Sequence, residues 1–216
     1  MPTANPPLSS PSRAIHIPRL EDLSPERVLV LANALTLWRG IAALGILIMG
    51  IAGAPWIAMF ALAVPMWVTD VLDGAVARRG WKRGAQPRID GKALDPMMDD
   101  VAFVCGFLVL FGAGAVPLWF VAGLLVSRVL FALLRMLSLA YDESFARPLF
   151  ATKFNGVFLA LGQLLLFAHL GLPETVIGND AFATAAIAAM TATTAYSVTR
   201  FAIHRHGRLL ARLLSA

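Results

Sequence analysis

Residues 69–100, TDVLDGAVARRGWKRGAQPRIDGKALDPMMDD, form a polar stretch between two long apolar blocks. Four of its aspartates form two pairs, Asp70 with Asp73 and Asp95 with Asp99. Residues three or four positions apart lie on the same face of a helix. Because two helices joined by a polar segment can face each other, the stretch predicts a helical hairpin with four carboxylates grouped at its polar end.

Apolar blocks of similar length make up most of the remaining chain. Of its 216 residues, 58% are hydrophobic and 14% are charged, and the mean hydropathy is +0.73. Soluble domains carry about 25% charged residues. The predicted fold is therefore an all-α integral membrane protein with six transmembrane helices, each near the roughly 20 residues that a bilayer requires. The predicted spans are 30–52, 55–77, 93–112, 117–140, 154–172 and 181–203.

The residues before the first block predict a short amphipathic juxtamembrane helix. Ser24 is suited to cap this helix and Pro25 to open its first turn. Val28 and Leu29 are then expected to face lipid. The chain is thus predicted to have three parts: a flexible cytosolic segment at 1–23, a membrane domain at 24–205 and a basic cytosolic tail at 206–216.

The basic residues predict how the helices are oriented. The breaks near residues 53 and 113 carry no charge, whereas Lys and Arg gather on the opposite side, and such loops are typically cytoplasmic. The net charge of +5 fits an anionic lipid surface rather than nucleic acid, because Trp81 is the one aromatic residue within the main basic loop. Both termini and the aspartates are expected on the cytosolic side. The Ala-, Gly-, Leu- and Arg-rich composition indicates a bacterial inner membrane.

Four carboxylates at the edge of a membrane need compensating positive charge. Each costs about 2.5–3.5 kcal/mol near the bilayer centre and less near the interface. Oxygen ligands suit Mg²⁺ or Mn²⁺, and four aspartates are enough for one ion or a bridged pair. The alternative is that the aspartates cap helix ends or pair with the nearby cations Arg78, Arg79 and Lys92.

Small residues and a cation accompany the aspartates. Gly74 directly follows the first pair, and Ala77 and Arg78 lie one turn later. Small residues let a ligand approach the backbone, and Arg78 can bind a phosphate through two N–H groups. Gly91 leaves an open place one turn before the second pair. These residues predict a diphosphate site beside the metal site.

The pattern Asp70-x2-Asp73-Gly74-x2-Ala77-Arg78, followed by Gly91-x3-Asp95-x3-Asp99, resembles the motif of the CDP-alcohol phosphotransferase family. The six predicted spans also match the architecture of that family, so the resemblance covers nearly all of the chain from the first span onward. One departure is the stretch between Arg78 and Gly91, which is longer than is typical of the family. We interpret it as an extended surface loop.

The resemblance implies direct transfer of a phosphatidyl group from CDP-diacylglycerol to an alcohol, with release of CMP. It also implies a homodimer and specific roles for the motif residues. Two Mg²⁺ or Mn²⁺ ions would be bound by Asp70, Asp73, Asp95 and Asp99, and Asp99 would also be the general base. The CDP moiety would contact Asp73, Gly74, Ala77, Arg78 and Gly91.

Cations in the later spans bear on the acceptor alcohol. Arg128 and Arg135 lie on one face of the fourth span, and Arg147 and Lys153 lie near the start of the fifth. A cluster of cations suits an acceptor that carries a phosphate, which favours sn-glycerol 3-phosphate, or phosphatidylglycerol as in a cardiolipin synthase, over inositol or choline. The alternative for the last three cations is that they extend to the lipid headgroups.

Further features resemble the phosphatidylglycerophosphate and cardiolipin synthase branch. The run NALTLWR in the first span offers Asn33, Thr36 and Arg39 as nucleotide or acceptor contacts, or alternatively as partners in helix–helix hydrogen bonds. Pro96 after the third aspartate is typical of this branch, whereas Asp100 replaces a common lysine. A membrane transporter or channel is the alternative from another class, because intramembrane Asp and Arg often line ion paths.

Overall fold

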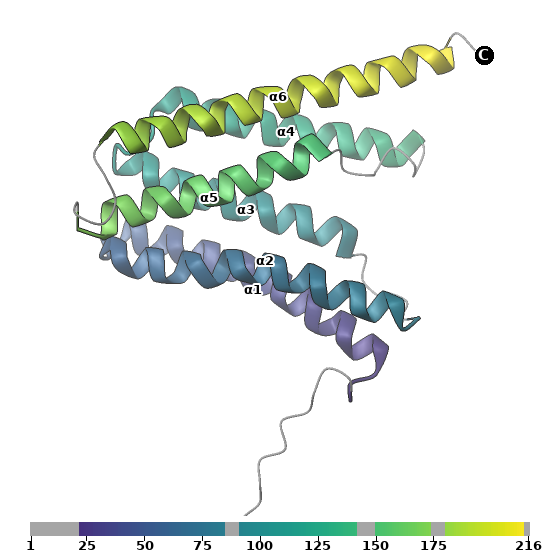
Figure 1. The fold of residues 1–216 in the computed structure, drawn as a ribbon, viewed down its shortest axis with the longest axis horizontal. Helices are drawn as coiled ribbons and strands as arrows, with labels where there is room; N and C mark the ends of the chain where they lie inside the picture. Colours follow the sequence, from purple (N-terminus) through teal and green to yellow (C-terminus); the bar gives the residue numbers. More distant parts are fainter. Residues whose placement is uncertain (1–21, 85–90, 142–149, 174–179, 214–216) are drawn as a thin grey trace, which may run out of the picture.

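The structure, a computed structural model, describes residues 22–84, 91–141, 150–173 and 180–213. The regular elements in these ranges are six helices, which confirms the predicted all-α fold class. Each helix contains most of one predicted span. The helices are α1 (Pro25–Ile51), α2 (Trp56–Lys82), α3 (Gly91–Gly112), α4 (Leu118–Tyr141), α5 (Phe150–Gly171) and α6 (Asp180–Leu213) (Figure 1).

Successive helices run in opposite directions along a common axis (Figure 1). The carboxyl end of α2 and the amino end of α3 therefore lie at the same end of the molecule, as the predicted hairpin requires. At the opposite end, Gly53 and Gly114 have φ angles of 68° and 74°. Glycine adopts this left-handed conformation without steric cost, so these two positions allow tight turns from α1 to α2 and from α3 to α4.

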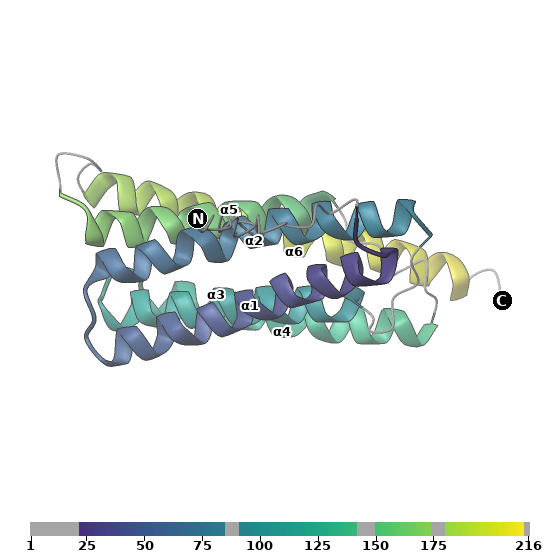
Figure 2. The same cartoon turned by 90° about the horizontal axis from the view of Figure 1, so that it is seen from below.

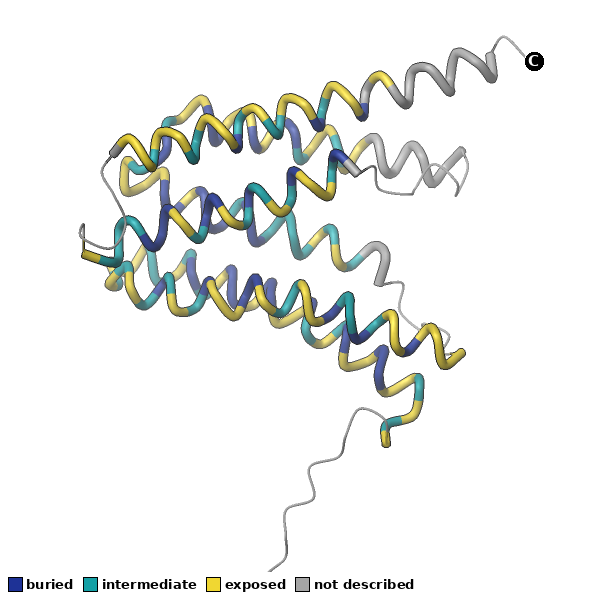
Figure 3. Tube along the Cα trace, in the orientation of Figure 1, coloured by how far each residue is buried: buried dark blue, intermediate teal, exposed yellow. Residues whose placement is uncertain are grey.

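The packing of α1 determines where the polar residues meet. α1 packs against both α2 and α3, while α5 contacts α2, α3 and α6, and α4 contacts α3 and α6 (Figure 2). The main buried cluster includes apolar side chains from all six helices. Buried positions lie where the helices face one another, and the described part of α6 is largely exposed (Figure 3).

Within the described ranges, four helical segments are long and apolar enough to cross a membrane: Pro25–Ile51, Trp56–Lys82, Ala151–Gly171 and Ala181–Phe201. The described apolar part of α4, Leu118–Leu133, is shorter, and α3 carries three aspartates in its first ten residues. Large apolar side chains point outward, and Ile51 is 80% exposed. Apolar surface of this extent is typical of contact with lipid, so the chain has the features of a membrane protein.

The start of α1 differs in part from the prediction. Ser24 caps the helix as predicted, since its Oγ accepts a hydrogen bond from the Arg27 backbone N–H at 3.4 Å. However, one continuous helix extends to Ile51, with no separate juxtamembrane helix in this segment. The expectation that Val28 and Leu29 face lipid is wrong, because they are 1% and 6% exposed. Packing of α1 against α2 buries both of them.

Two other boundaries also differ from the sequence prediction. α2 continues to Lys82, so the first residues of the expected loop after Arg78 are helical, and residues 85–90 lie outside the described ranges. α6 continues past residue 206, where the basic tail was expected to begin, and ends at Leu213. The division of the chain into three parts stays a prediction, and residues 1–21 of the first part lie outside the description.

Candidate active site

A buried arginine on α1 lies among the aspartates of α2 and α3. Arg39 is 0% exposed. Its Nη1 donates a hydrogen bond to Asp70 Oδ1 and lies 3.0 Å from Asp99 Oδ1, while its Nη2 lies 3.4 Å from Asp73 Oδ2. One guanidinium therefore forms ion pairs with three of the four aspartates, and these come from two helices.

Thr36, one turn before Arg39, brings in the fourth aspartate. The Thr36 hydroxyl lies 2.9 Å from Asp73 Oδ2 and 2.8 Å from Asp95 Oδ1. It also lies 3.2 Å from the carbonyl oxygen of Ala32. A hydroxyl has one proton to donate, so it serves these three oxygens only in turn. The fold thus groups the four carboxylates around two polar side chains of α1, which pack there because α1 contacts both neighbouring helices.

The charges within this group do not balance. Arg39 supplies one positive charge against four carboxylates. Asp99 Oδ1 is buried and makes no hydrogen bond within the described part of the chain, although Arg39 lies beside it. Oxygen donors with excess negative charge match the ligand preference of Mg²⁺ and Mn²⁺. The chemistry of the residues present therefore fits the predicted ions.

The arrangement of the carboxylates is set by Arg39 rather than by an ion position. Among the described residues, no three or more His, Cys, Asp or Glu side chains are placed to hold a metal ion. The guanidinium of Arg39 lies between carboxylates of α2 and α3. The roles of the four aspartates as metal ligands stay a prediction.

The residues expected to contact CDP lie beside the first aspartate pair. A Cβ atom placed on Gly74 would come within 3.2 Å of the Arg78 Nη1, so the glycine leaves room for this guanidinium over the helix. Ala77 is half-buried against the contact between α1 and α2, and Asn33 is also half-buried. Gly91 begins α3. The binding of CDP by these residues stays a prediction.

Arg128, one of the predicted acceptor cations, has an anionic partner within the chain. Its Nη1 lies 3.2 Å from Asp100 Oδ1, and its guanidinium lies 4.4 Å from the centre of the Phe103 ring. The side chain of Lys153 is exposed. The side chain of Arg135, and all of Arg147, lie outside the described parts. Of the four predicted cations, the structure therefore places Arg128 beside Asp100.

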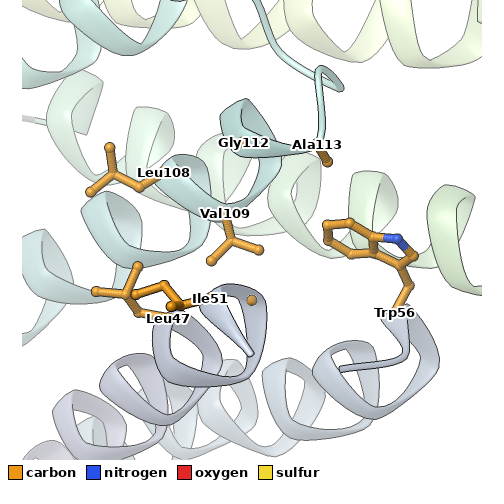
Figure 4. Close-up of a pocket in the computed structure, with 8 residues that line it drawn as sticks. Leu47, Ile51, Trp56, Leu108, Val109, Gly112 and Ala113 are labelled. Atoms are coloured by element: carbon orange, nitrogen blue, oxygen red, sulfur yellow. The ribbon is translucent and has the colours of Figure 1, made fainter. Parts of the chain in front are cut away.

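A separate apolar cavity lies at the other end of the helices. It has a volume of about 270 Å³ and lies between the end of α1, the start of α2 and the end of α3. Its lining includes Leu47, Trp56 and Val109 (Figure 4). Trp56 precedes Asp70 by about 21 Å along α2, at 1.5 Å per residue. The described lining of this cavity includes no charged side chain.

The comparison with models of protein families agrees with the resemblance in the motif. Neither the comparison with curated proteins nor that with solved structures finds a match. The model of the CDP-alcohol phosphatidyltransferase family matches residues 29–199. The match includes all four aspartates, Thr36 and Arg39, and it covers most of the 216 residues. The chain therefore belongs to the CDP-alcohol phosphatidyltransferase family and is a transferase of that kind.

Proposed function

We propose that the chain transfers the phosphatidyl group of CDP-diacylglycerol to sn-glycerol 3-phosphate and releases CMP, a step of phospholipid synthesis. The observation that carries this proposal is the meeting of four aspartates from α2 and α3 around Thr36 and Arg39 of α1. Family membership gives the reaction class. The phosphatidylglycerophosphate synthase branch rests on the sequence features of the first span and on Pro96.

Family members generally depend on a divalent metal, and we assign this role here to Mg²⁺ or Mn²⁺, with two ions in the site. Asp70, Asp73, Asp95 and Asp99 would hold them. When bound, the ions neutralise charge on the diphosphate of the donor.

The side chains of the protein have distinct roles in the proposed reaction. Asp99 accepts the proton of the acceptor hydroxyl. The acceptor oxygen forms a bond to the lipid-side phosphorus, the bond from that phosphorus to the CMP oxygen breaks, and CMP leaves with the electron pair. Arg78 binds a diphosphate oxygen beside Gly74. No covalent intermediate with the protein is needed, so the side chains act by positioning and charge stabilisation.

We assign Arg128 to the phosphate of the acceptor. Its guanidinium is held on α4 by the Phe103 ring and by Asp100. We assign Arg135, Arg147 and Lys153 to the same anion site. Phosphatidylglycerol, the acceptor of cardiolipin synthases, is the second candidate, because it also carries a phosphate.

Replacement of Asp100 by Asn tests this acceptor site. The ion pair with Arg128 competes with the phosphate of the acceptor, so its removal is expected to lower KM for glycerol 3-phosphate about fivefold, which corresponds to about 1 kcal/mol. Steady-state CMP release measures this value. Glycerol, which has no phosphate, is the control acceptor, and its KM should not change. An unchanged KM for glycerol 3-phosphate would show that Arg128 does not bind the phosphate of the acceptor.

The membrane arrangement completes the proposal. We place six spans in a bacterial inner membrane as a homodimer, with both termini and the aspartates on the cytosolic side. The four long apolar segments and the gathering of basic residues at the aspartate end support this arrangement. A transporter would need acids through the depth of the bilayer, whereas the four aspartates meet in one place.

The deciding experiment is CMP release from CDP-diacylglycerol by the detergent-purified protein. Reactions contain Mg²⁺ or Mn²⁺ and one of five acceptors: glycerol 3-phosphate, phosphatidylglycerol, serine, inositol or inositol phosphate. We expect release with glycerol 3-phosphate that EDTA abolishes. Release with another acceptor alone would replace the proposed substrate, and release with none from folded protein would reject the proposed reaction.

A further inference from the structure

A buried amide on α5 joins the two helices that carry the aspartates. Gln163 is 0% exposed. Its Oε1 accepts a hydrogen bond of 3.0 Å from the Trp67 Nε1 of α2. Its Nε2 donates one of 3.3 Å to the Ala102 carbonyl oxygen of α3. The amide therefore bonds to α2 through its oxygen and to α3 through its nitrogen.

The two residues that bond to Gln163 lie the same number of residues from an aspartate of the site. Trp67 precedes Asp70 by three residues, and Ala102 follows Asp99 by three residues. Each bond is therefore one helical turn from an aspartate that pairs with Arg39. A shift of α3 relative to α2 at the level of Gln163 would therefore change the distance between the Asp70 and Asp99 carboxylates.

The surroundings of Gln163 are shaped for this amide. Gly106 lies one turn beyond Ala102 on α3, and a Cβ atom at this position would overlap the Gln163 amide. The glycine thus lets the amide reach the backbone of α3. The Trp67 ring also packs on Phe103, with ring centres 4.7 Å apart, so the indole that donates to Gln163 is itself held against α3.

We propose that Gln163 is a positioning residue of the active site, which fixes α2 relative to α3 so that their aspartates bind metal and substrate in a productive arrangement. This inference rests on the proposed metal-dependent reaction. An amide buried in an apolar environment is costly unless both of its groups are bonded, so the bonded arrangement is strongly favoured over displaced ones. Phosphoryl transfer depends on positioning, and a displacement of about 1 Å can reduce a rate about 100-fold.

The test compares Gln163→Met with Asn155→Leu. Methionine keeps the unbranched shape but loses both bonds. Asn155 is also a buried amide on α5, 1% exposed, but it accepts its bond from Thr194 of α6 at 3.0 Å. Asn155→Leu therefore removes a buried interhelical bond without touching α2 or α3. Trp67→Phe, which removes one donor and keeps a ring, is the second variant if Gln163→Met does not fold.

Four quantities are measured for each variant in detergent: Tm, the Kd for Mn²⁺ from electron paramagnetic resonance of the free ion, and kcat and KM for CMP release. Both amide replacements should lower Tm. Gln163→Met should raise the Kd for Mn²⁺ about tenfold and lower kcat about tenfold or more, in the range found for residues that orient metal ligands. KM for CDP-diacylglycerol should change less than twofold. Asn155→Leu should leave the Kd and kcat within twofold of the unmodified chain.

The outcomes separate this inference from the proposed function. If Gln163→Met lowers Tm but binds Mn²⁺ and turns over like Asn155→Leu, Gln163 contributes packing alone and the inference is rejected. If the unmodified chain binds Mn²⁺ but releases no CMP, a weaker Kd in Gln163→Met still supports positioning while the proposed reaction fails. If the unmodified chain binds no Mn²⁺, the inference fails, because there is no ion whose ligands Gln163 would position.

Discussion

Replacement of Asp99 by Asn is expected to lower acceptor-dependent CMP release about 1,000-fold while the protein stays folded. Asparagine has nearly the same shape but cannot take the proton of the acceptor hydroxyl, and general base catalysis contributes about 100- to 10,000-fold. The variant also removes a carboxylate that lies 3.0 Å from Arg39. The measurement is CMP release at saturating acceptor, with Tm recorded in the same detergent.

Glu26→Gln is the matched control for this variant. It makes the same change from carboxylate to amide at an exposed position in the first turn of α1, so its kcat should be within twofold of the unmodified chain. Activity of Asp99→Asn within tenfold of the control would show that another group accepts the proton. The assignment of Asp99 as general base would then be wrong, although the family reaction would stand.

Replacement of Arg39 by Met is expected to destabilise the protein strongly when divalent metal is absent. Arg39 is fully buried and pairs with three carboxylates. Removal of one partner from a buried charge group costs about 3–5 kcal/mol, because the remaining charges lose their compensation. Tm in detergent with EDTA should therefore fall by several degrees or more.

Addition of Mn²⁺ should raise the Tm of Arg39→Met more than that of the unmodified chain. In the unmodified chain an ion bound by these aspartates would compete with the guanidinium for the same carboxylates, whereas in the variant it would bind without this competition. Arg27→Met, which removes an exposed arginine from α1, is the control and should respond to Mn²⁺ like the unmodified chain. Equal effects of Mn²⁺ on Arg39→Met and the control would contradict a shared site for Arg39 and the ion.

The sequence predicted the six helices well because their signals are local. Blocks of about 20 apolar residues separated by Gly and Pro mark spanning helices, and the observed helices follow these blocks. The errors concern features that depend on packing. Val28 and Leu29 look suited to lipid, but the contact of α1 with α2 buries them. Periodicity alone does not show which apolar face meets another helix.

Some residues of the candidate site were predicted from the sequence and others were not. The aspartates stand out because their spacing places each pair on one helix face. Thr36 and Arg39 were predicted as nucleotide or acceptor contacts, or alternatively as partners in helix–helix hydrogen bonds, because spacing within α1 does not reveal that it packs against both α2 and α3. Gln163 was missed, because one polar residue within an apolar run has no periodic pattern. Its signal in the sequence is a hydrogen-bonding side chain in the middle of the otherwise apolar run of residues 157–168.

The burial of Arg39 also bears on how the chain enters a membrane during synthesis. Arg39 leaves the ribosome 31 residues before Asp70, its first partner. If α1 entered alone, an unpaired arginine would cost up to about 2.5–3.5 kcal/mol, the value for the bilayer centre. We therefore expect α1 and α2 to insert together as a hairpin. Glycosylation mapping of truncated chains would show this as more efficient insertion of α1 when α2 follows it, and equal insertion without α2 would argue against it.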